Sequence, residues 1–210
     1  MAEPYRLLGC RGCGNVIVEA ALRVAGMPYR YEEVDYDQPG PARDRLIALN
    51  PLGQVPTLIM PDGSIMTESA AIVLLLDDMA PEAGLVPPPG TAERAPFLRW
   101  LIFLVAAIYP TFTYGDDPKK WLPDLEEAAM LKTATDRHRE SLWRQVEAAI
   151  APAPWFLGAR FSALDLYVGA MVHWRPRQTW FAKECPKLAG VAAEAERLPA
   201  LAPLFRQHFD

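Results

Sequence analysis

The sequence predicts an α/β domain over residues 1–80, a proline-rich linker over 81–90 and an all-helical domain over 91–210. Two patterns support this division. The first eighty residues alternate between strand-like and helical runs, whereas nearly everything after the linker has helical periodicity. The composition agrees with a folded protein, because 51% of the 210 residues are hydrophobic and 22% are charged. That balance favours a packed core over disorder.

The order of elements in the first domain favours a thioredoxin-like layer. The helical run over 15–25 stops at Gly26, with Pro28 beyond it, which is a common way for a helix to end. A strand–helix–strand start implies a parallel pair, and two later strands joined by the tight turn at 61–63 must be antiparallel. The expected elements are strand 5–8, helix 15–25, strand 29–35, helix 41–49, two short strands around the turn, and helix 68–79.

The linker and the helical domain have their own local signals. The segment 84–90 is too rich in proline for a helix or a central strand. Ser162-Ala-Leu-Asp165 matches a helix capping box, flanked by Phe161 and Leu166 as a hydrophobic staple, so Asp165 is expected to cap and not to catalyse. The helices expected after the linker cover 91–109, 124–150, 162–174, 187–196 and 200–207.

Charge and hydropathy exclude several classes of function. The net charge of -5 is spread without long runs, so no footprint for nucleic acid or an anionic membrane is present. The longest apolar run, 100–109, is about half of the ~20 residues that a membrane span needs. The start of the chain, Met1-Ala-Glu-Pro4, has no basic-then-apolar leader pattern. We therefore expect a cytoplasmic protein.

Cysteine and histidine usage bounds the redox and metal chemistry. The three cysteines, an odd and small number, argue against a secreted disulfide framework. The three histidines are scattered along the chain, and no second ligand pair stands near Cys10 and Cys13 at a zinc-like spacing. We expect no metal site.

The stretch from Asn50 to Val73 carries the most functional information. A loop ends in Val55-Pro56 just before a short apolar strand, and X-Pro is the one bond for which a cis peptide costs little. A cis bond would turn the Val55 backbone outward, where its N–H and C=O could pair with an extended peptide. Glu68 and Ser69 open the following apolar helix, whose unsatisfied N–H groups suit a carboxylate.

These residues at these spacings closely resemble the glutathione-binding half of cytosolic glutathione transferases, bacterial members in particular. The resemblance implies that Val55, before a cis Pro56, pairs with the cysteinyl backbone of glutathione. Ser69 and the helix start would bind the γ-glutamyl carboxylate of glutathione, and Glu68 would bind the γ-glutamyl ammonium group. Gln54 would make a further contact with glutathione. The α/β domain, proline linker and helical domain repeat the architecture of the same family, so the resemblance spans nearly the whole chain. A homodimer is implied by this resemblance alone.

The residues that would activate the glutathione thiol are less clearly marked. Lowering a thiol pKa by about two units requires roughly 3 kcal/mol of preferential thiolate stabilisation. The family places its Tyr, Ser or Cys for this task near the first strand end, where this chain reads Leu8-Gly-Cys-Arg-Gly-Cys-Gly-Asn15. Cys10 is favoured over Cys13, because Leu-Gly-Cys stands where many bacterial members have Tyr-Gly-Ser. Asn15 is a candidate amide donor, and a small buried thiol without a role is the alternative for either cysteine.

The Cys10-Arg-Gly-Cys13 spacing also supports a rival chemistry. A C-x-x-C pair at the start of a thioredoxin-fold helix is a redox motif, in which the first thiol attacks and the second resolves. Glutathione-dependent disulfide reduction, or cysteine-dependent dehalogenation or deglutathionylation, is therefore the second hypothesis. A non-catalytic binding or assembly module is the third, since this fold also serves as a docking domain.

A pocket for a small hydrophobic electrophile is expected to use aromatic side chains of the helical domain, although core packing is the alternative for each. Arg175-Pro-Arg177 could meet an anionic substrate or form a solvated turn. Pro110 and the segment 114–118 are expected to interrupt the helices at the edge of this pocket. The candidate walls are Tyr109, Phe112, Tyr114, Trp121 and Trp174. Neither the electrophile nor a choice between detoxification and a catabolic step follows from the sequence.

Overall fold

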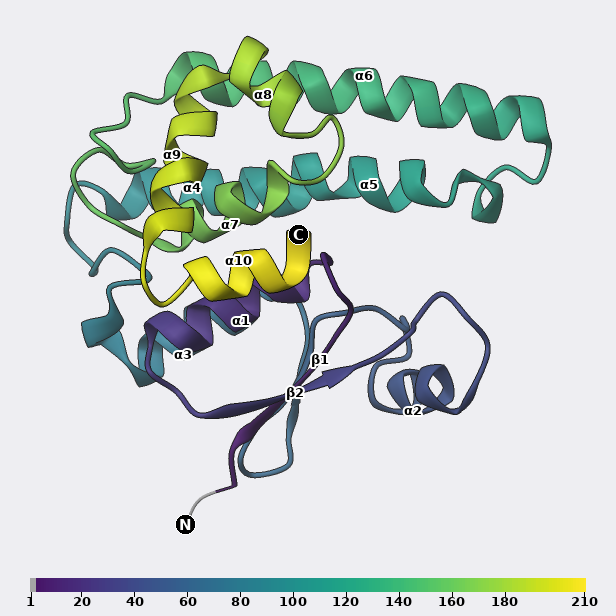
Figure 1. Ribbon diagram of the computed structural model, residues 1–210, viewed down its shortest axis with the longest axis horizontal. Helices are drawn as coiled ribbons and strands as arrows, with labels where there is room; N and C mark the ends of the chain where they lie inside the picture. Colours follow the sequence, from purple (N-terminus) through teal and green to yellow (C-terminus); the bar gives the residue numbers. More distant parts are fainter. Residues whose placement is uncertain (1–2) are drawn as a thin grey trace. The chain divides into compact units, whose positions relative to one another are not determined.

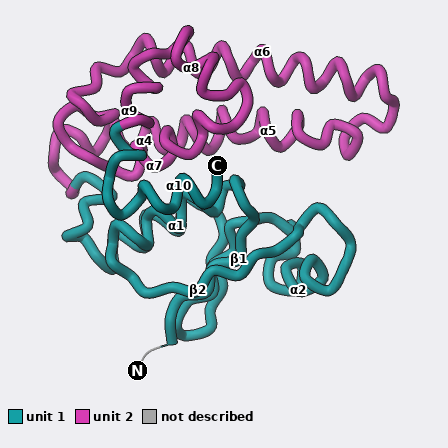
Figure 2. Tube along the Cα trace, in the orientation of Figure 1, with its two compact units in different colours: residues 1–87, 194–210 teal, residues 88–193 magenta. Residues whose placement is uncertain are grey.

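The computed structural model describes residues 3–210. Met1 and Ala2, the first residues of the segment that was expected to lack a leader pattern, lie outside the described residues. The chain forms two compact units (Figure 2). One comprises Met1–Pro87 with Glu194–Asp210, and the other comprises Pro88–Ala193. The sequence prediction placed everything after residue 90 in the helical domain, whereas the structure packs the last residues with the α/β unit.

The first unit contains a four-stranded mixed sheet in the order β2-β1-β3-β4. The central strand β1 pairs in parallel with β2 and antiparallel with β3, and β3 pairs antiparallel with β4. The predicted parallel pair and antiparallel hairpin are both confirmed. The strands are β1 (Tyr5–Gly9), β2 (Tyr29–Glu33), β3 (Thr57–Ile59) and β4 (Ile65–Met66).

Helices cover the sheet of this unit on two sides, as Figure 1 shows. α1 contacts α3 and α10, whereas Leu46 of α2 packs with Leu8 of β1 and Val34 in a separate buried cluster. Leu7 and Leu8 are both fully buried, because neighbouring side chains of a strand point to opposite faces. The helices are α1 (Asn15–Val24), α2 (Pro41–Leu49), α3 (Ser69–Met79), the 3-10 helix η1 (Pro81–Ala83) and α10 (Ala202–Phe209), with α9 (Pro186–Arg197) at the unit boundary.

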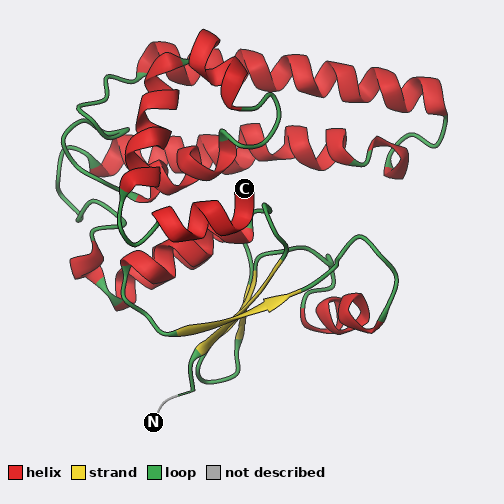
Figure 3. Ribbon diagram, viewed as in Figure 1, coloured by secondary structure: helices red, strands yellow, loops and turns green. Residues whose placement is uncertain are grey.

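The second unit is entirely helical (Figure 3). Its long helix α6 packs along α5, and α4 contacts α7. The predicted capping box at the start of α7 is present: the Asp165 carboxylate accepts the Ser162 N–H at 2.7 Å. The elements are α4 (Arg94–Phe103), the π-helical turn η2 (Leu104–Ile108), α5 (Tyr109–Asp116), the 3-10 helix η3 (Pro118–Lys120), α6 (Leu125–Ala149), α7 (Ala163–Met171) and α8 (Gln178–Glu184).

The prediction that Pro110 interrupts the helix was wrong. A continuous helical segment runs over Arg94–Asp116, and its π-helical turn η2 ends at Ile108, two residues before Pro110. Proline lacks an N–H and crowds the preceding turn, and a locally widened turn is a common way for a helix to adjust. This segment is long and apolar enough to cross a membrane by length and composition. The core helix of a soluble protein meets the same criterion.

Candidate functional site

The loop before β3 is held by a buried hydrogen-bond network. The Val55–Pro56 peptide bond is cis, as expected. The Gln54 carbonyl accepts from Asn50 Nδ2 and from Thr57 Oγ1, both at 3.0 Å, and Asn50 Nδ2 also lies 3.2 Å from Thr57 Oγ1. Asn50 and Thr57 are 5% and 0% exposed. The network turns the Gln54 carbonyl inward and fixes the backbone that leads into Val55.

The backbone of Val55 forms an open continuation of β3. None of the backbone hydrogen bonds among residues 3–210 involves Val55. Strand β4 pairs with β3 only at Leu58 and Ile59, so it leaves the preceding residues of that edge uncovered. An unpaired strand edge offers N–H and C=O groups to an extended peptide. Gln54, beside this edge, is exposed.

The start of α3 provides a second polar surface in the same unit. Glu68 precedes the helix with φ 62° and ψ 103°, a positive φ that is uncommon for a residue with a side chain. The Glu68 side chain forms no capping hydrogen bond with α3, and the first turn of α3 contains no acidic residue. Glu68 is exposed and Ser69 is half-buried. An uncapped helix start of this kind attracts an anion.

The loop between β1 and α1 brings the two candidate thiols together. The Sγ atoms of Cys10 and Cys13 lie 3.8 and 3.7 Å from the Arg11 carbonyl oxygen, and both side chains are half-buried. Burial raises the pKa of the Cys13 thiol to about 12, and the neighbouring Cys10 adds to this effect. Burial also raises the pKa of Cys10, against the lowering effect of its hydrogen bond with Cys13, and the carboxylates at the end of β2 and just after it add to the rise. The free protein therefore favours neutral thiols at both positions.

Asn15 has a well-defined place in this loop. Its Oδ1 accepts the Cys10 N–H at 3.0 Å, and the residue is fully buried. A Cβ atom on Gly9 would lie 2.5 Å from the Asn15 amide, so only glycine fits at the end of β1. Asn15 thereby shapes the loop, a task that the sequence did not predict. Its role as a donor to the glutathione sulfur stays a prediction.

Two residues that the sequence did not predict, Tyr36 and His208, contact this loop. Cys13 Sγ lies 3.8 Å from the Tyr36 hydroxyl, and Tyr36 also packs with Val55 against the cluster beneath β1. The parallel β1–β2 pair could have indicated Tyr36, since the carboxyl ends of parallel strands meet at one edge. His208 reaches the same loop from α10, and Glu19 on α1 contacts the other side of the His208 ring. No local sequence pattern indicates that contact.

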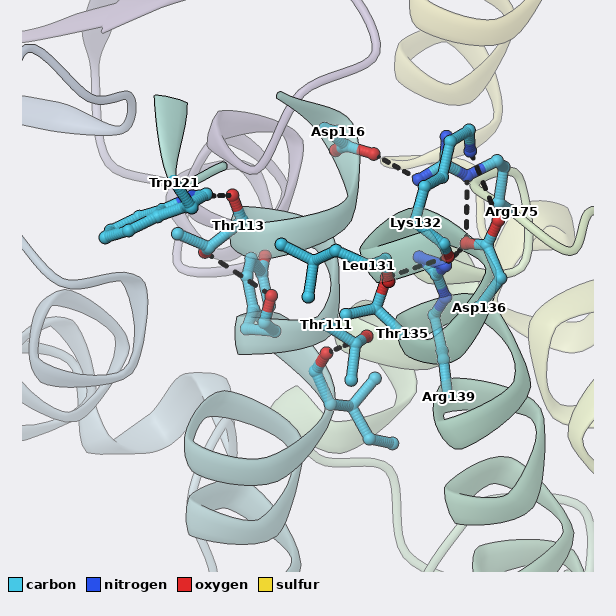
Figure 4. Close-up of polar contacts among 12 residues, drawn as sticks. Thr111, Thr113, Asp116, Trp121, Leu131, Lys132, Thr135, Asp136, Arg139 and Arg175 are labelled. Carbon is cyan, nitrogen blue, oxygen red and sulfur yellow. Dashed lines mark hydrogen bonds and ion pairs between the residues drawn. The ribbon is translucent and has the colours of Figure 1, made fainter. Parts of the chain in front are cut away.

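The aromatic residues predicted for an electrophile pocket form two groups in the second unit. Tyr109, Phe112 and Trp174 are in mutual edge contact, with ring centroids 5.4–6.5 Å apart. Tyr114 and Trp121 form a separate pair at 4.9 Å, and the Trp121 indole N–H donates to the Thr113 carbonyl (Figure 4). Three of the five predicted walls therefore cluster, and the other two pair elsewhere.

A polar cluster of residues from α5, α6 and the turn after α7 (Figure 4) contacts the first group at Phe112. Arg139 is 1% exposed, pairs with Asp136, and lies 4.1 Å from the centre of the Phe112 ring. Burial lowers the pKa of Arg139 to about 10. Arg175 pairs with Asp116 at 2.5 Å and with Asp136 at 3.4 Å. Arg175 is thus engaged in ion pairs and does not form a simple solvated turn.

Within residues 3–210, no group of three or more His, Cys, Asp and Glu side chains is placed to hold a metal ion.

Comparison with known proteins identifies relatives of this chain. Residues 17–79 match the family model described as the glutathione S-transferase N-terminal domain. The chain is 37% identical to the uncharacterized GST-like protein YncG of Escherichia coli K12, over 97% of this chain and 98% of that protein. It is 30% identical to glutathione S-transferase GstA of Escherichia coli O157:H7, over 62% of each chain. A crystal structure of a glutathione transferase homolog from Sulfitobacter with bound glutathione has the same fold, with a TM-score of 0.84 and 23% identity over the full length of both chains.

Proposed function

The chain belongs to the glutathione S-transferase family, and we propose that it is a glutathione transferase. In this proposal the thiolate of bound glutathione attacks a small hydrophobic electrophile. The observation that carries the proposal is the unpaired Val55 backbone at the uncovered edge of β3. A peptide as short as glutathione gains affinity and orientation by pairing with such an edge as an added strand.

The proposed contacts follow from the two polar surfaces of the α/β unit. The Val55 N–H and C=O pair with the cysteinyl backbone of glutathione, beside Pro56, and Gln54 makes a further contact. The uncapped start of α3 and the Ser69 hydroxyl take the γ-glutamyl carboxylate. The exposed Glu68 carboxylate takes the ammonium group, as a charge-assisted hydrogen bond.

Thiol activation is assigned to the loop between β1 and α1. The start of α1 has no side-chain cap, so its partial positive charge favours a thiolate placed nearby. Cys10, Cys13 and Asn15 are the candidate donors. With an aryl halide, the sulfur–carbon bond forms as the carbon–halogen bond breaks, and the halide leaves with the bonding electron pair. The thiol proton passes to water before the attack.

Calorimetric titration with glutathione tests the proposal directly. Ser69→Ala is expected to weaken binding by about tenfold, the effect of one lost hydrogen bond to a charged group. Ser64→Ala is the matched control, because the Ser64 hydroxyl bonds Asp62 within the exposed turn. A glutathione analogue that is N-methylated at the cysteinyl amide tests the pairing with Val55 and should bind far more weakly. Absence of any glutathione binding to the wild type would refute the proposal.

A glutathione-dependent disulfide reductase or deglutathionylase is the second candidate, since the loop brings Cys10 and Cys13 together. The raised pKa of both thiols disfavours it, because the thiolate is the attacking species. Loss of hydroxyethyl disulfide reduction in Cys10→Ser, with aryl halide conjugation weak in the wild type, would favour this candidate. Equal conjugation by wild type and the Cys10→Ser, Cys13→Ser double variant would remove cysteine from the mechanism.

The remaining parts of the proposal rest on family membership. We propose a cytoplasmic homodimer that binds glutathione and a small electrophile and uses no metal. The aromatic group of Tyr109, Phe112 and Trp174 is the better candidate for contact with the electrophile, because its three rings are in mutual edge contact. A non-catalytic binding module would bind glutathione without any conjugating or reducing activity, and activity assays therefore separate it from both enzymes.

A further inference from the structure

The last turn of the chain is hydrogen-bonded to the loop that carries both candidate thiols. The Gly12 N–H donates to His208 Nδ1 at 3.1 Å, across 196 positions of sequence. On the other side of the ring, His208 Nε2 lies 3.0 Å from Glu19 Oε2 on α1. The side chains of His208 and Glu19 are each 1% exposed. The imidazole therefore bridges the loop and the helix inside the packed α/β unit.

The hydrogen bonds define which ring nitrogen carries the proton. Nδ1 accepts from a backbone N–H, so it must present its lone pair, and Nε2 must carry the hydrogen that faces the carboxylate. Burial acts to raise the pKa of Glu19, but hydrogen bonds from His208 and from the Tyr29 hydroxyl outweigh it and keep the pKa below its ordinary value. The buried carboxylate is thus ionised and holds the ring in one tautomer.

The loop conformation depends on this contact for geometric reasons. Gly12 has φ +72°, a left-handed conformation that glycine adopts readily, and it lies beside the last turn of α10. Side chains hold two of the loop amides, since Asn15 accepts from Cys10 and His208 accepts from Gly12. The Cys13 N–H bonds back to the Cys10 carbonyl at 3.2 Å. The direction of each of these amides is therefore determined by a named acceptor.

We propose that His208 is a positioning residue for the reaction, acting through the Gly12 N–H on the loop that holds Cys10 and Cys13. It contacts neither glutathione nor the electrophile in this proposal. Its Nδ1 orients the loop at the start of α1, and Glu19 keeps that nitrogen free to accept. The catalytic part of this inference rests on the proposed function, because it assumes that the loop activates the glutathione thiol.

Two conservative variants separate the two bonds of the ring. Asn places an acceptor near the position of Nδ1, so His208→Asn is expected to keep the Gly12 bond and lose the Glu19 bond. Gln reaches the position of Nε2, so His208→Gln is expected to keep the Glu19 bond and lose the Gly12 bond. Each variant loses one buried bond, and His208→Asn should be the more destabilised of the two, because it removes the ring donor to the buried Glu19 carboxylate. A purely structural histidine therefore predicts that His208→Asn loses at least as much activity as His208→Gln.

The kinetic test compares the effect of each variant on kcat with its effect on the KM for glutathione. We expect His208→Gln to lower kcat by about tenfold, the effect of one hydrogen bond, with little change in KM. His208→Asn should stay within about twofold of the wild type, since its Gly12 bond is kept. Equal kcat in the two variants would overturn the proposal.

A second readout does not depend on activity. The rates at which Cys10 and Cys13 react with an aromatic disulfide, followed by peptide mass spectrometry, report the loop directly. They should change in His208→Gln and stay close to wild type in His208→Asn. If the thiol reaction rates follow this pattern in a protein that shows no conjugating activity, His208 still positions the loop, and the proposed function fails.

The wild-type protein supplies a test that needs no variant. Nitrogen chemical shifts of the His208 ring should show a protonated Nε2 and an unprotonated Nδ1. A protonated Nδ1 at neutral pH would overturn the proposal, even if both variants fail to fold.

Discussion

The backbone at Glu68 offers a direct test of how the start of α3 is built. Glu68 has a side chain at φ 62° and ψ 103°, and residues held in such regions cost about 1–3 kcal/mol of stability. Glycine avoids most of this cost, although its greater freedom in the unfolded chain takes back about 0.5–1 kcal/mol. We therefore compare Glu68→Gly with Glu68→Ala, because both remove the carboxylate and only alanine keeps a Cβ.

The expected difference can be measured by thermal unfolding. Glu68→Gly should be more stable than Glu68→Ala by roughly 1 kcal/mol. For a chain of this size, that difference corresponds to a Tm higher by about 2–4 °C. Equal Tm values, or a lower value for the glycine variant, would refute the inference that the backbone is strained at this position.

The same pair of variants tests the proposed ammonium contact by calorimetry. Loss of a hydrogen bond to a charged group costs about 1.5–3 kcal/mol, so both variants should bind glutathione roughly 10- to 100-fold more weakly. Unchanged affinity in both variants would exclude Glu68 from the glutathione site while leaving the stability argument intact.

Three further predictions concern other contacts. Gly9→Ala should lower the unfolding free energy by about 1–3 kcal/mol in denaturant titrations, because the new Cβ meets the buried Asn15 amide; an unchanged midpoint would contradict this. Asn50→Ala removes the amide that donates to the Gln54 carbonyl, so it should lower the free energy of unfolding by about 1–3 kcal/mol and weaken glutathione binding. Normal affinity for glutathione would show that the loop keeps its shape without this hydrogen bond. Burial raises the pKa of the Asp165 carboxyl to about 6. The stability that this group contributes is therefore complete below pH about 4 and is lost as the pH rises through about 6, which lowers the free energy of unfolding by roughly 3 kcal/mol. The stability of the wild type relative to Asp165→Asn should fall over that window, and a difference independent of pH would contradict the shift.

The family fold was predictable because its signals are local. The turn at 61–63, the proline before β3 and the periodicity of α1 each depend on residues within a few positions, and short-range sterics and hydrogen bonding determine them. The sheet order then follows from short connections and the handedness of a strand–helix–strand unit. The predicted glutathione contacts come from the same stretch, and the structure leaves the Val55 backbone open as that prediction requires.

Predictions from the sequence were wrong or missing where an element depends on contacts with residues far away in the chain. Pro110 reads as a helix break, yet the π-helical turn before it lets the helix continue. The short helix α8, over Gln178–Glu184, has no strong local signal and was not predicted. Glu19 and Arg139 are charged, yet each is 1% exposed and paired, which no local pattern in the sequence indicates. A charge is tolerated inside a protein only when it is paired. Glu19 meets His208 of α10, whereas Arg139 pairs with Asp136 on its own helix and lies against the Phe112 ring of α5.

By itself, the sequence determined the α/β and helical character of the two halves, the loop before β3 and the polar start of α3. Only the tertiary structure decided that the C-terminal helix packs on α1 and that His208 bonds the Gly12 amide. The buried environment that keeps Cys10 and Cys13 neutral was likewise decided only by the tertiary structure. Local patterns encode backbone conformation, whereas the direction of a buried hydrogen bond and the pKa of a thiol depend on which distant groups share the same small volume.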